Sequence, residues 1–300
     1  MSVLAIAMVL DAALGEPKWL WDRFAHPAVL MGRAVGWTDA HLNRGPGRRI
    51  KGVVAMLALG LSAVLLGALL TSLGPVVEVI VVAILLAQRS LVDHVRAVAD
   101  GLRLSVAEGR RAVAMIVGRD TTGMDRAAVS RAAIESAAEN FSDGVVAPVF
   151  WYILAGLPGL LLYKMTNTAD SMIGYRTPRH AAFGWAAARF DDLLNLIPAR
   201  ATAALFALVL GVTGQRAAIT AEAGQHRSPN AGWPEAAMAR GLGVALSGPR
   251  AYEGEMRDYP FVNPKGCRDT GADDIERATG ALWRTWAVLL GVALVLAALD

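Results

Sequence analysis

Long apolar runs alternate with polar segments along the chain. The longest stretch without a charged residue extends from Gly52 to Val77, and one helical crossing of a bilayer needs roughly 20 apolar residues. Gly74-Pro75 interrupts this stretch, and residues 76–86 continue as a second apolar run. Because glycine and proline break helices, the pattern predicts two membrane helices that form a tight hairpin.

Residues 144–163 form another uncharged run of spanning length. Pro148, Gly156 and Pro158 lie inside it, and a proline removes a backbone donor from the helix interior. We therefore expect this segment to be broken or re-entrant, because it cannot form one straight membrane helix.

Three shorter apolar runs complete the pattern. Residues 201–215 and 285–299 reach spanning length only when the neighbouring residues join them. Residues 1–10 have neither a basic start nor a convincing cleavage site. We therefore expect a retained membrane helix that continues toward Gly15, and not a signal peptide.

Three polar segments separate the apolar runs: residues 16–51, 89–143 and 216–280. In the second segment apolar residues recur at three- and four-residue steps, which predicts helix. The third segment is rich in proline and glycine, which predicts ordered loops around short helices. We therefore expect an all-α, polytopic membrane protein with a single integral membrane domain over residues 1–300, about five transmembrane helices, and extramembrane helices and loops in the polar segments.

The composition agrees with a membrane protein. Hydrophobic residues make up 55 % of the chain, charged residues 18 %, and the mean hydropathy is +0.42; such an apolar chain is not disordered. Basic residues exceed acidic ones by only 3 and aromatic residues make up 7 %, so we expect no nucleic-acid partner. Cys267 is the only cysteine and the histidines show no H-x-x-x-H spacing, which makes a zinc enzyme improbable.

Positive charge gathers on both sides of the predicted hairpin, in residues 18–51 and 89–131. The positive-inside rule places these flanks in the cytoplasm. We therefore expect a multi-pass protein of the inner (cytoplasmic) membrane, surrounded by the lipid bilayer.

Acidic side chains recur at helical spacing in the second polar segment. Glu135, Glu139 and Asp143 lie four residues apart and share one face if the helix continues. Such a stripe repels itself unless cations neutralise it, and Asn140 adds an oxygen ligand that suits a hard cation such as Mg²⁺. The alternative is a solvated helix face with arginines nearby.

A second polar group directly follows the apolar run of residues 144–163. Lys164, Asn167 and Asp170 are spaced by three residues, and ionisable groups at membrane depth are costly and usually functional or paired. Equally consistent with the sequence, Lys164 extends to the interface and pairs with Asp170.

A third group precedes the next apolar segment. Asp191, Asp192 and Asn195 form a D-D-x-x-N pattern, followed by Arg200. Paired acids can hold Mg²⁺ against a phosphorylated substrate while an arginine contacts the phosphate, although Asp191 could equally cap a helix. The polar turn at Arg119-Asp120 offers donors to phosphate, and the chain has neither a P-loop nor a dinucleotide-binding glycine motif.

Several motifs together resemble the CobD/CbiB family of cobalamin biosynthesis, in the family's order and over nearly the whole chain. The matching blocks are residues 118–121, 135–140, 143–148, 163–175, 189–200 and 228–239. The chain departs from the usual pattern at residues 19–25 and at Ser247-Gly248-Pro249, and neither departure touches an acidic group.

The resemblance implies an adenosylcobinamide-phosphate synthase. Such an enzyme uses ATP and Mg²⁺ to join aminopropanol or its O-phosphate to a propionate carboxylate of the corrinoid substrate, adenosylcobyric acid. Since a carboxylate does not react with an amine unaided, the simplest activation is an acyl phosphate. Other cobalamin-assembly enzymes are possible protein partners.

Residue roles follow from the chemistry placed on these motifs. The expected magnesium and ATP-phosphate ligands are Glu135, Glu139, Asp143 and Asp170, with Asp191 and Asp192 completing the charge cage. Lys164 and Arg200 would neutralise phosphate or the acyl oxygen. The groups expected to contact or orient bound ligands are Arg119, Asp120, Asn140, Asn167, Asn195, Ser228 and Asn230.

Two other functions fit the residues when the resemblance is set aside. A membrane prenyl or phospho-alcohol transferase also holds Mg²⁺ and diphosphate with paired acids, and ATP dependence separates it from a ligase. A transporter could use Lys164, Asp170 and Asp192 as an intramembrane ion path, and it would move substrate without cleaving ATP.

Overall fold

The computed structural model describes residues 1–252 and 255–299, and nearly all regular structure in that part of the chain is helical. The helices are α1 (Ser2–Leu14), α2 (Lys18–Trp21), α3 (Pro27–Leu42), α4 (Arg48–Ser72), α5 (Pro75–Leu85), α6 (Gln88–Leu104), α7 (Val106–Val113), α8 (Arg126–Phe141), α9 (Ala147–Ile173), α10 (Trp185–Leu194), α11 (Leu196–Val209), α12 (Arg216–Ala223), α13 (Gly232–Leu242) and α14 (Ala272–Leu299). A π-helical turn, η1 (Ser142–Val146), joins α8 to α9, and a 3₁₀ turn, η2 (Thr213–Gln215), precedes α12.

The expected all-α membrane architecture is confirmed. Within the described residues, four helical runs are long and apolar enough to cross a membrane, and α10 with α11 forms a bent fifth candidate. The four are Arg48–Ser72, Pro75–Leu104, Arg126–Ile173 and Ala272–Leu299. The apolar helix α1 is shorter than these runs.

The chain divides into two compact units. The first consists of residues 1–87, 147–196 and 293–300, and the second of residues 88–146 and 197–292.

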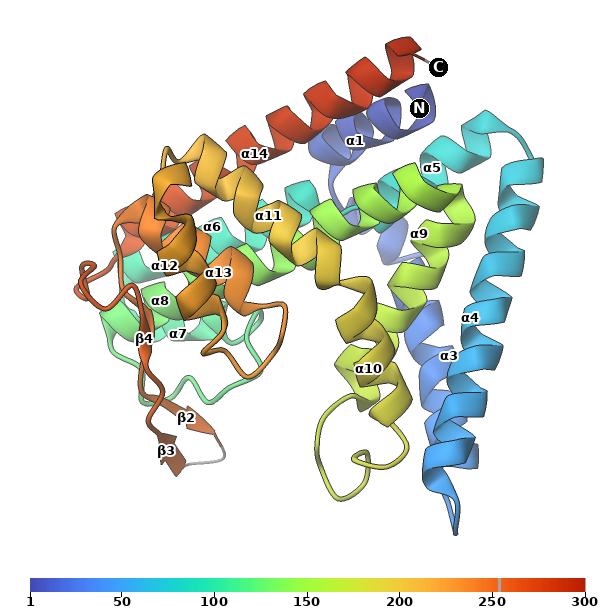
Figure 1. The fold of residues 1–300 in the computed structure, drawn as a ribbon, viewed down its shortest axis with the longest axis horizontal. Coiled ribbons are helices and arrows are strands. Elements are labelled where there is room, and N and C mark those ends of the chain that lie inside the picture. Colours follow the sequence, from blue (N-terminus) through green and yellow to red (C-terminus); the bar gives the residue numbers. More distant parts are fainter. Residues whose placement is uncertain (253–254, 300) are drawn as a thin grey trace. The chain divides into compact units, whose positions relative to one another are not determined.

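In the first unit, α4 packs along α9 and beside α3, as Figure 1 shows. Gly67 of α4 allows the close approach, because a Cβ atom there would lie 2.5 Å from the Cα atom of Pro158 in α9. The predicted break in α9 is confirmed: Ala155 and Gly156 leave helical geometry, and Gly156 takes a φ of 63° that glycine tolerates far better than other residues.

The prediction of a tight hairpin at Gly74-Pro75 is only half right. The chain does turn there, with Gly74 at a φ of 102°. Helix α5, however, packs mainly against α1 and touches α4 only near the turn (Figure 1). The reason is burial. Val82 and Leu85 of α5 are buried, and this helix packs mainly on α1 instead of along α4.

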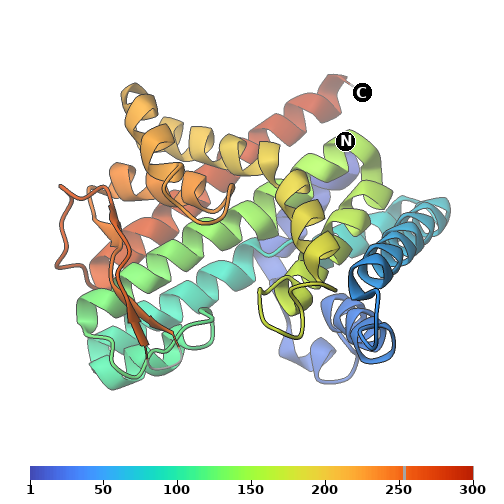
Figure 2. The ribbon, with the colours of Figure 1, turned by 60° about the horizontal axis from the view of Figure 1, so that its bottom comes forward.

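The second unit is built around α6 and α8, which run side by side in cyan and green in Figure 2. The predicted helical periodicity is confirmed, since Leu91, Val95, Val98 and Leu102 of α6 are all buried. Helix α7 packs on both α6 and α8, and α13 packs on α8.

Two small antiparallel sheets also occur in this unit and were not predicted. They pair β1 (Leu246–Ser247) with β4 (Phe261–Val262) and β2 (Arg250–Tyr252) with β3 (Glu255–Arg257). Strands of two or three residues are too short to show an alternating pattern in the sequence.

Candidate functional site

The first unit gathers a cluster of oxygen-bearing side chains on α9 and α10. Asp191 is its centre: Nδ2 of Asn167 donates to one carboxylate oxygen at 3.3 Å, and Nδ2 of Asn195 donates to the other at 3.0 Å. The hydroxyl of Tyr163 donates to Oδ1 of Asn195 at 3.0 Å. This chain of hydrogen bonds from a fully buried tyrosine fixes the direction in which Asp191 points.

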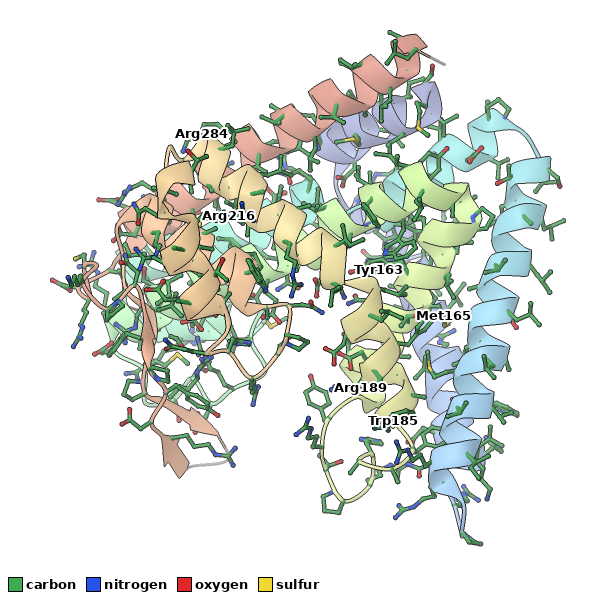
Figure 3. All side chains as sticks on the ribbon, in the orientation of Figure 1. Tyr163, Met165, Trp185, Arg189, Arg216 and Arg284 are labelled. Atoms are coloured by element: carbon green, nitrogen blue, oxygen red, sulfur yellow. The ribbon has the colours of Figure 1, made fainter. Side chains whose placement is uncertain are left out.

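Asp170 and Asp192 bring two more negative charges to the same cluster. Their charges act on Asp191, and the charge of Asp192 also acts on Asp170. Arg189 lies one turn before Asp192 and forms an ion pair with it at 2.8 Å; Figure 3 labels this arginine on α10. The charge of Arg176 also acts on Asp192, so three carboxylates face two arginines and the cluster keeps an excess of negative charge.

The donor set of this cluster fits Mg²⁺. It consists of carboxylate and amide oxygens, which hard cations prefer. No three His, Cys, Asp or Glu side chains among the described residues are close enough to enclose a metal ion by themselves. Mg²⁺ is usually held by one or two carboxylates, waters and substrate phosphates, so the cluster suits an ion that arrives with a nucleotide.

Lys164 lies on α9 in the same unit and is half-buried. Its positive charge acts on His26, whose pKa is lowered mainly by burial and further by this lysine. The described ion pair of the cluster joins Asp192 to Arg189. The pairing of Lys164 with Asp170 stays a prediction.

The second unit contains a different cluster, centred on Glu135 of α8. Nη2 of Arg119 lies 3.0 Å from its Oε2, and Nη1 of Arg250 lies 3.3 Å from the same oxygen. The backbone N–H of Ser247 donates to Oε1 at 2.8 Å. Glu135 is thus a buried carboxylate bound by two guanidinium groups and a backbone donor, and it is less available to a metal ion than the sequence predicts.

Glu139 and Asn140 follow one turn later and are exposed, although they lie on the same helix as buried Glu135. The charges of Glu135, Arg227, Arg250 and Arg119 all act on Glu139. Asn140 donates to the carbonyl and hydroxyl oxygens of Ser136, which leaves its own carbonyl oxygen as an acceptor.

Asp143 lies inside the π-helical turn and is half-exposed. The wider turn shifts Asp143 from the position that an uninterrupted α-helix would give it, so the stripe of Glu135, Glu139 and Asp143 is not perfectly aligned. Single π-helical turns are frequent at functional sites.

Glu235 of α13 is a member of the Glu135 cluster that the sequence did not reveal. It is 5 % exposed, its Oε1 has no hydrogen-bond partner in the part of the chain that the structure describes, and its Oε2 lies 3.9 Å from Nε2 of His226. Burial, aided by the charge of Glu135, raises the pKa of Glu235 well above its usual range. Burial also lowers the pKa of His226, so both groups favour their uncharged forms.

Three other predicted site residues of the second unit, Ser228, Asn230 and Arg200, contact neighbouring protein groups. Ser228 accepts from the backbone of Asn230 and Ala231 just before α13, as a turn-forming serine does. Nη1 of Arg200 lies 3.4 Å from Oδ1 of Asn230, and the guanidinium stacks 4.6 Å from the ring of Trp233.

Asp120 is half-exposed and shapes its own turn. The hydroxyl and backbone N–H of Thr122 both donate to its Oδ1 and lower its pKa. This Asx-turn carries the chain from Arg119 toward α8 and explains the polar turn predicted at this point.

The structure thus sorts the predicted residues into two groups. Within the first unit it brings together Asn167, Asp170, Asp191, Asp192 and Asn195, and within the second it joins Arg119 to Glu135 and Arg200 to Asn230. Sequence reasoning missed Arg250, Ser247, Glu235 and His226. The signal that could have found Glu235 is an acid followed by the apolar run Ala236-Ala237-Met238, since a buried carboxylate in a helix is usually functional or paired.

Fold and clusters define a class: a multi-pass α-helical membrane protein with one cluster suited to a hard cation and one rich in arginine. Comparison with protein families matches residues 4–282 to the CobD/CbiB proteins. The chain belongs to this family.

Curated relatives match over nearly their full length. The cobalamin biosynthesis protein CobD of Sinorhizobium fredii is 50 % identical, covering 98 % of this chain and 96 % of that protein. The CobD of Rhizobium meliloti is 51 % identical, covering 96 % and 94 %, and that of Rhodobacter capsulatus is 46 % identical, covering 87 % and 86 %. No solved structure matches the chain.

Proposed function

We propose that this protein acts in cobalamin biosynthesis as an ATP- and Mg²⁺-dependent ligase of the inner membrane. It joins aminopropanol or aminopropanol O-phosphate to a propionate carboxylate of adenosylcobyric acid and forms an amide. The observation that carries the proposal is the cluster of Asp170, Asp191 and Asp192, found in a chain whose relatives are named cobalamin biosynthesis proteins.

The first unit supplies the cation site. Asn167 and Asn195 hold Asp191 in place by hydrogen bonds. The excess negative charge of the three aspartates attracts the Mg²⁺ ion of a magnesium–nucleotide complex. When bound, Mg²⁺ neutralises charge on the transferring phosphoryl group. One or two carboxylates among Asp170, Asp191 and Asp192 would hold the ion together with water and phosphate oxygens, and Lys164 of the same unit adds a positive charge for phosphate oxygens.

The second unit supplies cationic groups for anionic ligands. Arg119 and Arg250 are fixed on Glu135, so little side-chain entropy is lost when they meet a phosphate or a carboxylate. Nε of Arg119 is buried and has no acceptor among the described residues. Glu139 is exposed beside these arginines.

The chemistry requires activation of the corrinoid carboxylate. One carboxylate oxygen attacks the γ-phosphorus of ATP, ADP leaves, and an acyl phosphate forms. The amine, after losing a proton, attacks the acyl carbon, and the carbon–oxygen bond to phosphate breaks with release of inorganic phosphate.

Coupled nucleotide cleavage tests this proposal. Purified protein in detergent is incubated with ATP and Mg²⁺, and ADP is measured with adenosylcobyric acid, with the amine, and with both. We expect ADP to accumulate in proportion to product only when both substrates are present. A prenyl or phospho-alcohol transferase or a transporter would show no such ADP release, and that result would refute the ligase.

A further inference from the structure

A small pocket opens in the second unit beside the Glu135 cluster. Residues of α12 and of the loop between α12 and α13 supply one wall, and the other consists of Ser247, Arg250, Tyr259, Pro260 and Val262. The lining residues are Glu222, Gln225, His226, Arg227, Ser247, Arg250, Tyr259, Pro260 and Val262. None of them was predicted as a site residue from the sequence.

The charge of the lining is positive. Arg227 and Arg250 contribute two cations, and Glu222 is the only acid in the lining. Arg240, which lies outside the lining, binds Glu222 through both carboxylate oxygens at 2.9 Å and 2.6 Å. The negative charge of Glu222 is therefore matched by Arg240, and Glu135, which holds Arg250, is also bound by Arg119. An anion entering the pocket thus meets an excess of positive charge.

The pocket is also preorganised. Arg250 is held by Glu135 and by the hydroxyl of Ser247, and its guanidinium lies 4.7 Å from the ring centroid of Tyr259. Ser247 has a φ of 59°, a conformation that costs a non-glycine residue energy and that is often found at binding sites. An arginine fixed in this way offers its donors to a phosphate with little loss of freedom.

The geometry points to a phosphate-binding site formed by Arg227, Arg250 and Tyr259. The ligand is a phosphate group carried by a small molecule, because the pocket is small and does not enclose a corrinoid. The phosphate comes either from the nucleotide or from a phosphorylated amine. Only this choice of ligand rests on the proposed function; the site itself rests on the lining and its charge.

Calorimetric titration of the full-length protein in detergent tests the site. The ligands are inorganic phosphate, ADP and aminopropanol O-phosphate, with adenosine and free aminopropanol as matched compounds that lack phosphate. We expect wild-type protein to bind a phosphorylated ligand more tightly than its phosphate-free counterpart. Arg227→Gln should weaken that binding by about tenfold or more, since a charge-assisted hydrogen bond to phosphate is lost.

Arg216→Gln is the matched control. Arg216 is an exposed arginine at the start of α12 in the same unit, labelled in Figure 3, and its loss should leave binding unchanged. Arg250→Lys provides a second variant that keeps the positive charge but loses the paired donors, and it should also weaken binding. The ligand whose affinity falls identifies the source of the phosphate.

Two results would overturn the site: no phosphate-dependent binding by folded wild-type protein, or equal affinities for wild type, Arg227→Gln and Arg250→Lys. The proposed function is tested separately by amide formation. Arginine-dependent binding without amide product would retain the site and reject the ligase. Amide product with unchanged binding in the variants would retain the ligase and reject the site.

Discussion

Arg119 and Glu135 form a buried ion pair in which Nη2 lies 3.0 Å from Oε2 and the two side chains are 8 % and 10 % exposed. The two residues are 16 positions apart, and the Asx-turn at Asp120 brings the chain back so that they meet. The ion pair joins two separate sequence motifs into one cluster, to which Arg250 and Ser247 then add.

The first prediction concerns the stability of this ion pair. Arg119→Gln removes one of the two guanidinium groups from buried Glu135 and should lower the free energy of unfolding by about 3 kcal/mol, because a buried charge loses a partner. Thermal unfolding in detergent measures the loss. The double variant Arg119→Gln with Glu135→Gln should lose less than the sum of the single variants, and strictly additive losses would show that the two residues do not interact.

Asp191→Asn tests the proposed cation site. The substitution keeps the shape of the side chain but replaces one of its two accepting oxygens with a donor and removes one negative charge, so turnover should fall by about 100-fold or more while the fold is retained. The Mg²⁺ concentration that gives half-maximal rate should rise. Asp93→Asn is the control, because Asp93 is an exposed partner of Arg89 and such pairs contribute little. Similar losses in both variants would argue against a special role for Asp191.

Glu139→Gln should abolish turnover and leave the protein folded. Glu139 is exposed on α8 and lies in the field of three arginines, so its charge is not needed for packing. Initial rates and thermal unfolding are measured on the same preparation. Glu108→Gln, at an exposed pair with Arg111, serves as control; normal activity of Glu139→Gln would remove this residue from the site.

Glu235 predicts a pH dependence of stability. Burial raises the pKa of this carboxyl in the folded protein, whereas in the unfolded chain the same carboxyl loses its proton at about pH 4.3. Above that pH the unfolded state binds fewer protons than the folded state, so this group makes the folded state progressively less stable until the folded pKa is reached. Glu235→Gln removes the effect, and its melting temperature should fall less than that of wild type between pH 5 and pH 8. Parallel curves for the two proteins would contradict the raised pKa.

Much of the fold was readable from the sequence because it depends on local pattern. The periodicity of Leu91, Val95 and Leu102 predicted α6, and glycine and proline predicted the break at Gly156. The course of α5 was not readable, because its packing on α1 depends on which distant apolar face is free. Strands as short as β1 and β4 carry no periodic signal at all.

The site was predicted only where its residues lie in local motifs. Asp191, Asp192 and Asn195 share one turn, so spacing revealed them, and the hydrogen bonds to Asp191 agree with that grouping. Arg250 lies 115 residues after Glu135, and no spacing rule joins residues that only the tertiary structure brings together. The magnesium and ATP roles of the individual acids remain predictions.

The central proposal is ATP-dependent amide formation through a phosphorylated carboxylate, and oxygen labelling tests it most directly. Adenosylcobyric acid carrying ¹⁸O in the reacting carboxylate is incubated with the purified protein, ATP, Mg²⁺ and each amine, and the corrinoid and the phosphate are analysed by mass spectrometry. We expect an amide product that retains one labelled oxygen, an equal amount of ADP, and the second labelled oxygen in inorganic phosphate. No amide from folded protein, or an amide formed without label in the phosphate, would contradict the proposal.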